Sequence, residues 1–272
     1  MTSHWNILEK TKNEYLKQVG HYPDFNKLNM YCVAHFSSVI EGASLTFRET
    51  WRLLDEGITP SRPEKHVSMV IDHFNALMYA FRLAFRKEKL TLQHLEKINS
   101  FINRRTGETG ICPNTQTFYD TAEGQLRTYG AFTMMDDGSR KDYLHPHDVR
   151  DETKLLLKNI HQGLTNYSSF EKVNQLSFQA HYDMTRIHPF GEGNGRTARL
   201  VMNYIQYYHG YPLSFILSRD RDSYDASLDA TDRTSDLKHF ETFMMKASLN
   251  AFRQGIETLK PSKEYKNPLY ER

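Results

Sequence analysis

Cysteine is scarce in this sequence, and long apolar runs are absent. Its 272 residues include only two cysteines, Cys32 and Cys112, which are too few and too far apart for a disulfide framework or a zinc site. No apolar stretch approaches the roughly 20 residues that a membrane-spanning helix needs. No basic segment followed by an apolar run, typical of a signal peptide, opens the chain. We therefore expect a soluble, cytoplasmic protein that has no membrane partner.

An excess of one charge is also lacking. The 35 basic and 33 acidic residues leave a net charge of +2, so the composition disfavours a nucleic-acid partner. The 13 histidines are scattered and form no metal-ligand spacing. With 39% hydrophobic and 25% charged residues, the chain has the composition of a globular protein and is long enough to bury a substantial core.

The most informative stretch is residues 187–199, Ile-His-Pro-Phe-Gly-Glu-Gly-Asn-Gly-Arg-Thr-Ala-Arg. Apolar residues recur at helical spacing over residues 170–187, which predicts a helix there. Pro189 and the glycines end that helix, and Asn194 is expected to cap a second helix that runs to Tyr208. A glycine-rich loop that opens onto a helix N-terminus presents free backbone amides, so the pattern predicts an anion site.

Charged side chains around this loop indicate its chemistry. Arg196 and Arg199 are three residues apart and share one side of the helix, where they can bind phosphate groups. Glu192 is a hard oxygen ligand, suited to Mg²⁺ beside phosphates. His188, at the end of the first helix, could accept a proton from a nucleophile. Together these residues favour nucleotidyl or phosphoryl transfer.

The same residues resemble the signature of the Fic family, His-Pro-Phe-x-Asp/Glu-Gly-Asn-Gly-Arg-x-x-Arg, and fill every specified position of it. The resemblance implies a protein adenylyltransferase that transfers AMP from ATP, with Mg²⁺, to a Ser, Thr or Tyr hydroxyl of a target protein. His188 would be the catalytic base, and Glu192 would hold the metal. The implied nucleotide-binding residues are Glu192, Gly193, Asn194, Gly195, Arg196, Thr197, Arg199 and Tyr224.

A second stretch, Ser37-Ser-Val-Ile-Glu41-Gly42, lies in a helix expected over about residues 24–42. Ser37 and Glu41 are four residues apart, so the hydroxyl could orient the carboxylate. The stretch resembles the inhibitory motif of Fic proteins, Ser/Thr-x-x-x-Glu/Asp-Gly/Asn. The resemblance implies that Glu41 pairs with Arg199 and takes the place of the γ-phosphate, so that ATP binds without its α-phosphate aligned for attack.

A β-hairpin is expected over residues 127–143, with Asp137-Gly138 as its turn. In the Fic family such a hairpin, the flap, pairs with the backbone of the target segment. Here the candidate docking residues are Gly130, Ala131, Phe132, Thr133 and Met134. Tyr224 matches a family tyrosine near the adenine. Ser223 and Thr231 stand where relatives often have another tyrosine and an asparagine, which leaves the base preference open.

The sequence thus predicts a mainly α, Fic-type helical bundle with one β-hairpin flap, and a loop over residues 107–124. We expect one globular unit made of an N-terminal region (1–120), a catalytic core (121–230) and a C-terminal helix and tail (231–272). Two other functions stay open: a hydrolase in which Glu41 orients water to remove AMP, and a nucleotide-sensing regulator without turnover. Other donors, such as those of UMP or phosphocholine, also fit the signature, and analogy with relatives allows a homodimer.

Overall fold

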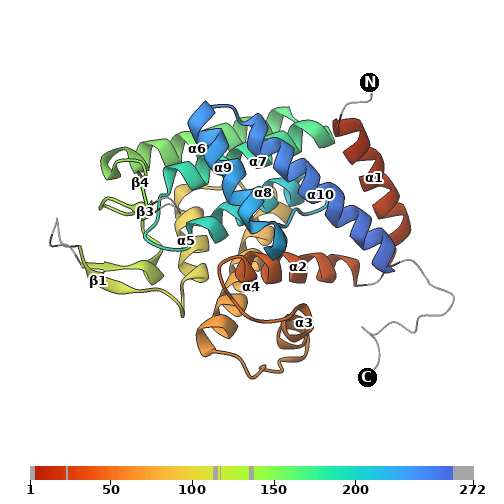
Figure 1. Ribbon diagram of the computed structural model, residues 1–272, viewed down its shortest axis with the longest axis horizontal. Coiled ribbons are helices and arrows are strands. Elements are labelled where there is room, and N and C mark those ends of the chain that lie inside the picture. The colour runs from red at the N-terminus through yellow and green to blue at the C-terminus, as the bar shows by residue number, and fades with distance from the viewer. Residues whose placement is uncertain (1–3, 23, 113–115, 117, 135–137, 260–272) are drawn as a thin grey trace.

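The protein is a helical bundle with two small hairpins (Figure 1). The computed structural model describes residues 4–22, 24–112, 116, 118–134 and 138–259. Residues 257–259 are described by their backbone only. This part of the chain confirms the predicted mainly α fold. Its α-helices are α1 (His4–Val19), α2 (Phe25–Val39), α3 (Phe47–Glu56), α4 (Glu64–Phe85), α5 (Leu92–Ile102), α6 (Pro146–Asn166), α7 (Phe170–Ile187), α8 (Asn194–Tyr208), α9 (Arg221–Thr234) and α10 (Lys238–Leu259).

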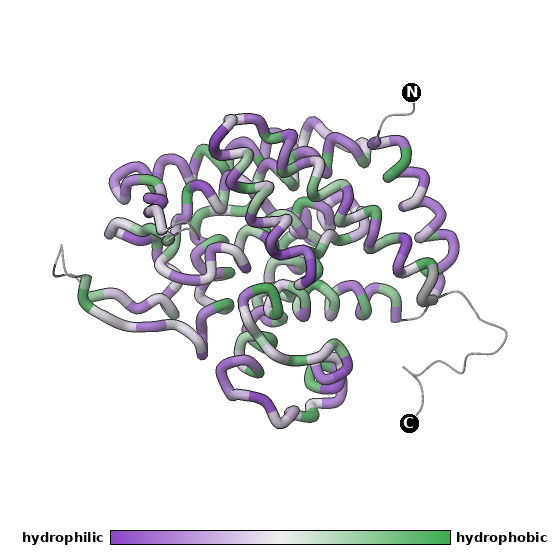
Figure 2. Tube along the Cα trace, in the orientation of Figure 1, coloured by the Kyte–Doolittle hydropathy of each residue, from purple (hydrophilic) through white to green (hydrophobic). Residues whose placement is uncertain are grey.

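Helix α8 lies at the centre of the bundle and packs against α7, α4, α5, α2 and α6 (Figure 1). Most of its side chains are buried, including polar Asn203 and Gln206, which bond to backbone and side chains around Ser214. Along the outer helices, hydrophobic and hydrophilic residues alternate with the helical period (Figure 2). Burial of one face of each amphipathic helix therefore closes the core around α8.

The helix–loop–helix around residues 170–208 has the predicted elements. Ser169 caps α7 by accepting a hydrogen bond from Lys172 N at 3.4 Å. The helix ends at Ile187, because His188 adopts the left-handed conformation at φ 50°. The prediction that Asn194 caps α8 is wrong. Gly193 takes that position at φ 76°, which favours glycine, and Asn194 is the first residue of the helix.

Two hairpins extend from the bundle. Strands β3 (Phe132–Met134) and β4 (Arg140–Asp142) pair antiparallel, with Thr133 opposite Lys141, and they confirm the hairpin predicted over residues 127–143, which is called the flap below. Asp137, half of the predicted turn, lies outside the described residues. The loop predicted over residues 107–124 is wrong, since strands β1 (Thr109–Ile111) and β2 (Phe118–Asp120) form a second hairpin there. These strands are three residues long, too short for alternation to mark them.

Helix α2 packs against α4 and α8, while α1 packs against α10. Helix α2 ends at Val39, so Glu41 and Gly42 lie in the turn beyond it, and Gly42 has φ 98°. The packing of α2 on α8 carries this turn to the N-terminal part of α8. Among the helices that the structure describes, none combines the length and the apolar character needed to cross a lipid bilayer.

Candidate active site

One cleft of about 730 Å³ opens between the N-terminus of α8, the flap and α9. It brings together seven of the residues predicted from the sequence: Glu41, Thr133, Met134, His188, Gly195, Arg199 and Tyr224. The other predicted residues lie outside its lining: Ser37, Gly42, Gly130, Ala131, Phe132, Glu192, Gly193, Asn194, Arg196 and Thr197. The cleft also has charged walls, which include Lys141 of β4 and Asp229 of α9.

His188 stands where α7 ends and faces the cleft. Its imidazole stacks on the ring of Tyr143, with the two ring centroids 3.7 Å apart and the planes 17° apart. Burial, reinforced by the positive charge of Arg127, lowers the pKa of His188 to about 4. The ring is therefore neutral near pH 7 and able to accept a proton.

Arg127 links the backbone of His188 to the flap through hydrogen bonds. Its Nε donates to His188 O at 2.7 Å, its Nη1 to Tyr129 O at 2.7 Å, and its Nη2 to Leu144 O and Ile187 O. Only 3% of the residue is exposed. No local pattern in the sequence indicated this role, because the acceptors are backbone carbonyls as far as 61 positions away. Arg127 thus joins both ends of the flap to the backbone beneath His188.

Arg199 is held by the turn that follows α2. Its Nη2 donates to Glu41 Oε1 at 2.6 Å and to Ser37 O at 3.1 Å, and its Nε donates to Ser37 Oγ at 2.8 Å. Ser37 and Glu41 therefore meet on the same guanidinium. The direct contact expected between their side chains is not among the hydrogen bonds of the described residues.

The Glu41 carboxylate is the only partly exposed member of this group, with 36% of its side chain accessible. Burial acts to raise the pKa of Glu41, but Arg199, with Arg196 and Arg221, outweighs it and holds the pKa below its ordinary value. Arg221 also donates to Ile40 O at 2.8 Å and so fixes the turn. A Cβ on Gly195 would lie 2.6 Å from Glu41 Oε1, which shows how closely the carboxylate approaches α8.

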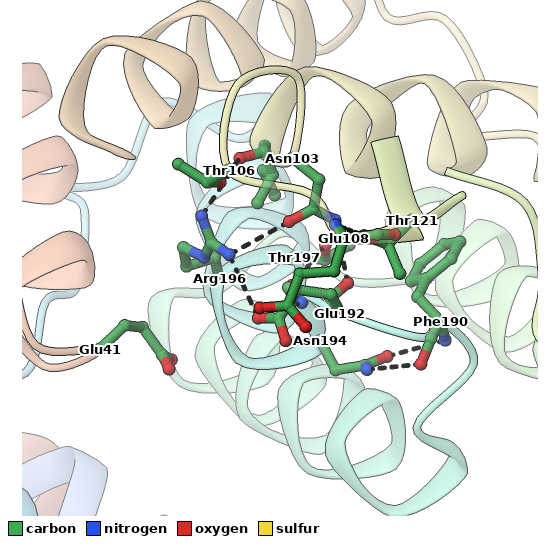
Figure 3. Close-up of polar contacts among 12 residues, drawn as sticks. Glu41, Asn103, Thr106, Glu108, Thr121, Phe190, Glu192, Asn194, Arg196 and Thr197 are labelled. Carbon is green, nitrogen blue, oxygen red and sulfur yellow. Dashed lines mark hydrogen bonds and ion pairs between the residues drawn. The ribbon is translucent and has the colours of Figure 1, made fainter. Parts of the chain in front are cut away.

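Arg196 points the other way, toward the end of α5 (Figure 3). Its Nη1 donates to Ile102 O at 3.1 Å, and its Nη2 donates to Asn103 Oδ1 at 3.1 Å and to Glu192 Oε1 at 3.4 Å. The guanidinium is as buried as that of Arg199, at 3% exposed. This arginine therefore links the loop of residues 188–193 to the end of α5.

Two side chains predicted to bind nucleotide also stabilise the loop itself. Asn194 accepts from Phe190 N at 2.9 Å and donates to Phe190 O at 2.8 Å (Figure 3). Thr197 Oγ1 donates to Gly193 O at 2.9 Å. Two residues with no signal in the sequence complete the support: Asn99 and Asn103 each donate to Glu192 O, at 2.9 and 3.0 Å. The loop conformation is thus fixed before any ligand binds.

Tyr224 lies deep in the cleft wall and is 5% exposed. Its hydroxyl shares a 3.2 Å hydrogen bond with Nε2 of buried His181. Thr231, which replaces the family asparagine, donates to Ser227 O at 2.9 Å and accepts from Phe240 N at 3.2 Å. Thr231 therefore has a structural role between α9 and α10.

A metal ion could be held at Glu192, whose side chain is 49% exposed. Its Oε1 already accepts from Gly193 N at 3.0 Å. Nowhere in the described ranges do three or more His, Cys, Asp or Glu side chains gather into a metal site. An ion at Glu192 would thus draw its other ligands from phosphate oxygens and water, which is the coordination that Mg²⁺ prefers.

Comparison with known protein sequences agrees with the resemblance of the signature to the Fic family. Residues 89–206 match the model of the Fic/DOC family. The chain is 36% identical over 241 residues to "Protein adenylyltransferase fic-1" of Caenorhabditis elegans, a match that covers 86% of this chain and 42% of that protein. It is 39% identical over 92 residues to "Protein adenylyltransferase Fic" of Drosophila persimilis, covering 33% of this chain and 18% of that protein. The chain thus spans less than half the length of these relatives.

Solved structures share the fold. A Fic domain containing signaling protein from Bacteroides thetaiotaomicron superposes with a TM-score of 0.75 at 20% identity, covering 99% of this chain and all of that one. Residues 134–508 of Fic-1 from C. elegans give a TM-score of 0.74 at 20% identity and cover 94% of this chain and 72% of that one. The matched family model, the complete signature and the shared fold agree: this chain is a member of the Fic/DOC family.

Proposed function

We propose that the chain is a protein adenylyltransferase that transfers AMP from ATP to a Ser, Thr or Tyr hydroxyl of a target protein. One observation carries the proposal: a single cleft is lined by His188, the first turn of α8 at Gly195, Arg199 and the flap strand β3. A base, an anion-binding helix end and an edge strand for a peptide are the three parts that this reaction needs. Both relatives described above are named protein adenylyltransferases, which supports the proposal.

In the proposed reaction, His188 removes the proton from the target hydroxyl, and that oxygen attacks the α-phosphorus of ATP. The bond from the α-phosphorus to the bridging oxygen breaks, and pyrophosphate leaves. The backbone amides of Gly193, Asn194 and Gly195 would neutralise phosphate charge together with Arg199. Arg196, predicted from the signature to bind phosphate, would instead support the loop that carries these amides. Glu192 would hold Mg²⁺, which when bound supplies further charge neutralisation at the phosphates.

Two further parts belong to the same proposal. Tyr224, which lines the cleft, would contact the adenine, with Thr197 supporting the loop that binds the phosphates. Residues 130–134 would pair with the backbone of the target segment, and Thr133 and Met134 already line the cleft. The homodimer, the cytoplasmic location and the division of the chain at residues 120 and 230 stay predictions.

We further propose that Glu41 inhibits the transfer. Its carboxylate binds Arg199 Nη2 at 2.6 Å, and an arginine that is already paired cannot bind a phosphate with the same nitrogen. Ser37 adds two contacts to that guanidinium, and Gly42, at φ 98°, allows the tight turn that presents Glu41. Release of the turn would free Arg199 for the nucleotide.

The test measures transfer of label from α-labelled ATP, with Mg²⁺, to the protein itself and to a cell lysate. We expect weak labelling by the parent, strong labelling by Glu41→Gly and none by Glu41→Gly with His188→Ala. Glu56→Gly is the matched control, since Glu56 is the last residue of α3 and also pairs with an arginine, at 3.5 Å in an exposed ion pair. Equal labelling by the single and the double variant would exclude His188 as the base.

A hydrolase that removes AMP is the second candidate, because Glu41 lines the same cleft as His188 and remains partly exposed to water. Release of AMP from a modified target by the parent, lost in Glu41→Gly, would favour this reaction. Binding of ATP without transfer or release in any variant would instead indicate a nucleotide sensor.

A further inference from the structure

Tyr143 follows strand β4 and covers one face of the His188 imidazole. The two ring centroids are 3.7 Å apart, and the planes are nearly parallel at 17°. The nitrogen lone pair of a neutral imidazole lies in the ring plane, at its edge. A ring stacked on the face therefore restricts rotation of His188 and leaves the proton-accepting edge open.

The tyrosine is itself fixed by the flap. Its backbone N donates to Ala131 O at 2.9 Å, next to the first residue of β3. Lys141, two residues earlier and on the same face of the strand, donates to Asp229 Oδ1 at 3.2 Å and forms an ion pair with Asp232, both on α9. These contacts hold the backbone that carries Tyr143 close to His188 and α9.

From this geometry we infer that Tyr143 is a positioning residue: its ring holds the His188 imidazole in the plane from which it accepts the proton. The inference rests on the proposed AMP transfer for its kinetic consequence, but the stack and its effect on His188 exist without substrate. An aromatic ring at position 143 is what the role requires, and the phenolic hydroxyl is not. This role belongs to the part of the flap after β4, beyond the residues predicted to bind the target.

The charged groups that face His188 come from three elements. Arg127, before the flap, and Lys141, on β4, act to lower the pKa of His188, while Glu41, after α2, acts to raise it. A hydrogen bond to the Thr185 backbone also acts to raise it. Burial has the largest effect, and the stacked ring contributes to that burial. Removal of the ring lets water reach the imidazole and leaves the four other groups in place.

The experiment compares Tyr143→Phe, Tyr143→Leu and Tyr143→Ala in the full chain that also carries Glu41→Gly. Two quantities are measured: kcat and KM for ATP in label transfer, and the pKa of His188 by NMR of ¹³C-labelled histidine. The His188 resonance is assigned by its loss in His188→Ala. Tyr167→Ala is the control, because Tyr167 is an exposed tyrosine at the end of α6.

We expect Tyr143→Ala and Tyr143→Leu to lower kcat about 10- to 100-fold, as misplacement of a catalytic group does, with KM for ATP nearly unchanged. The pKa of His188 should rise from about 4 toward its ordinary value of 6.5. Tyr143→Phe should keep both values, as should the control. Because Leu retains apolar bulk without a flat ring, it separates stacking from loss of folding.

An unchanged His188 pKa and an unchanged kcat in both Tyr143→Ala and Tyr143→Leu would overturn the inference. Equal losses in Tyr143→Phe and Tyr143→Ala would also overturn it, since the hydroxyl would then be the essential group. If no variant transfers label, the proposed function fails, and the NMR titration still decides whether Tyr143 controls the environment of His188.

Discussion

Arg196 and Arg199 stand three residues apart on α8, yet their guanidinium groups have unlike surroundings. Arg196 donates to a backbone carbonyl and an amide oxygen at the end of α5, while Arg199 donates to Glu41 and Ser37 from the α2 turn. Burial acts to lower the pKa of both; at Arg196 it prevails, whereas the Glu41 carboxylate raises the pKa of Arg199. One arginine supports the loop, and the other is paired with a carboxylate that is partly exposed to solvent.

The contrast shows that a signature does not assign one role to each residue type. Both arginines are 3% exposed, but only Arg199 lines the cleft. A partner such as Ile102 O belongs to the core and remains in place. Glu41, by contrast, lies beyond the end of α2, and its side chain is 36% exposed.

The largest expected effect concerns Arg199. In the Glu41→Gly background, Arg199→Ala should lower transfer of label from α-labelled ATP at least about 100-fold, as removal of a charge-stabilising donor does. Transfer is compared per folded molecule, because the substitution also leaves Ser37 O and Ser37 Oγ without their donor and so lowers the melting temperature. A large loss of stability with unchanged transfer per folded molecule would instead assign Arg199 the supporting role.

Arg196 should show its main effect in stability. Arg196→Ala leaves Ile102 O and Asn103 Oδ1 without their donor inside the protein, so the free energy of unfolding should fall by about 2–4 kcal/mol. Urea denaturation measures the change. The control is Arg86→Ala, which breaks an exposed ion pair of 3.6 Å with Glu88 and should change the free energy by less than about 0.5 kcal/mol. Equal values for the two variants would contradict the assignment.

Local patterns in the sequence were enough to predict part of this arrangement. The apolar period and the glycines predicted α7 and the helix that follows, because both signals lie within the segment itself. The resemblance to the inhibitory motif led to the pair of Glu41 with Arg199, which the structure contains at 2.6 Å.

Contacts between distant segments could not be predicted in this way. Three side chains donate to backbone carbonyls of His188 and Glu192 that lie between 61 and 93 residues away: Arg127, Asn99 and Asn103. A periodic pattern in the sequence does not indicate such partners. Tyr143 reaches His188 only because the flap folds over the cleft. The prediction that Asn194 caps α8 was wrong for a local reason: its side chain bonds to Phe190, four residues back, while Gly193 occupies the cap position.

Gly195 lies where the Glu41 carboxylate approaches α8, so a substitution at this position tests that contact. An added Cβ would lie 2.6 Å from Glu41 Oε1, the end of a flexible side chain. Gly195→Ala should therefore destabilise the parent by about 1 kcal/mol. In the Glu41→Gly background the same substitution should stabilise the protein by about 0.5 kcal/mol, since alanine has a higher helix propensity than glycine. Urea denaturation of the four proteins forms a double-mutant cycle. A sum of the two single effects without coupling would show that Glu41 does not contact this position.

The smallest effect is the pH dependence of the Glu41–Arg199 pair. The pKa of Glu41 is held below its ordinary value of 4.5 by Arg199, so the folded protein binds a proton there less readily than the unfolded chain does. The pair therefore contributes its full stability above pH 4.5 and loses it as the pH falls through the folded pKa. The difference in unfolding free energy between the parent and Glu41→Gln should be constant from pH 8 to about pH 5 and shrink on further acidification. It should stay at or below about 1 kcal/mol, because the carboxylate is 36% exposed and water screens the pair. A difference that grew on acidification would mean that the folded protein favours protonated Glu41, and the turn would then not hold an ion pair.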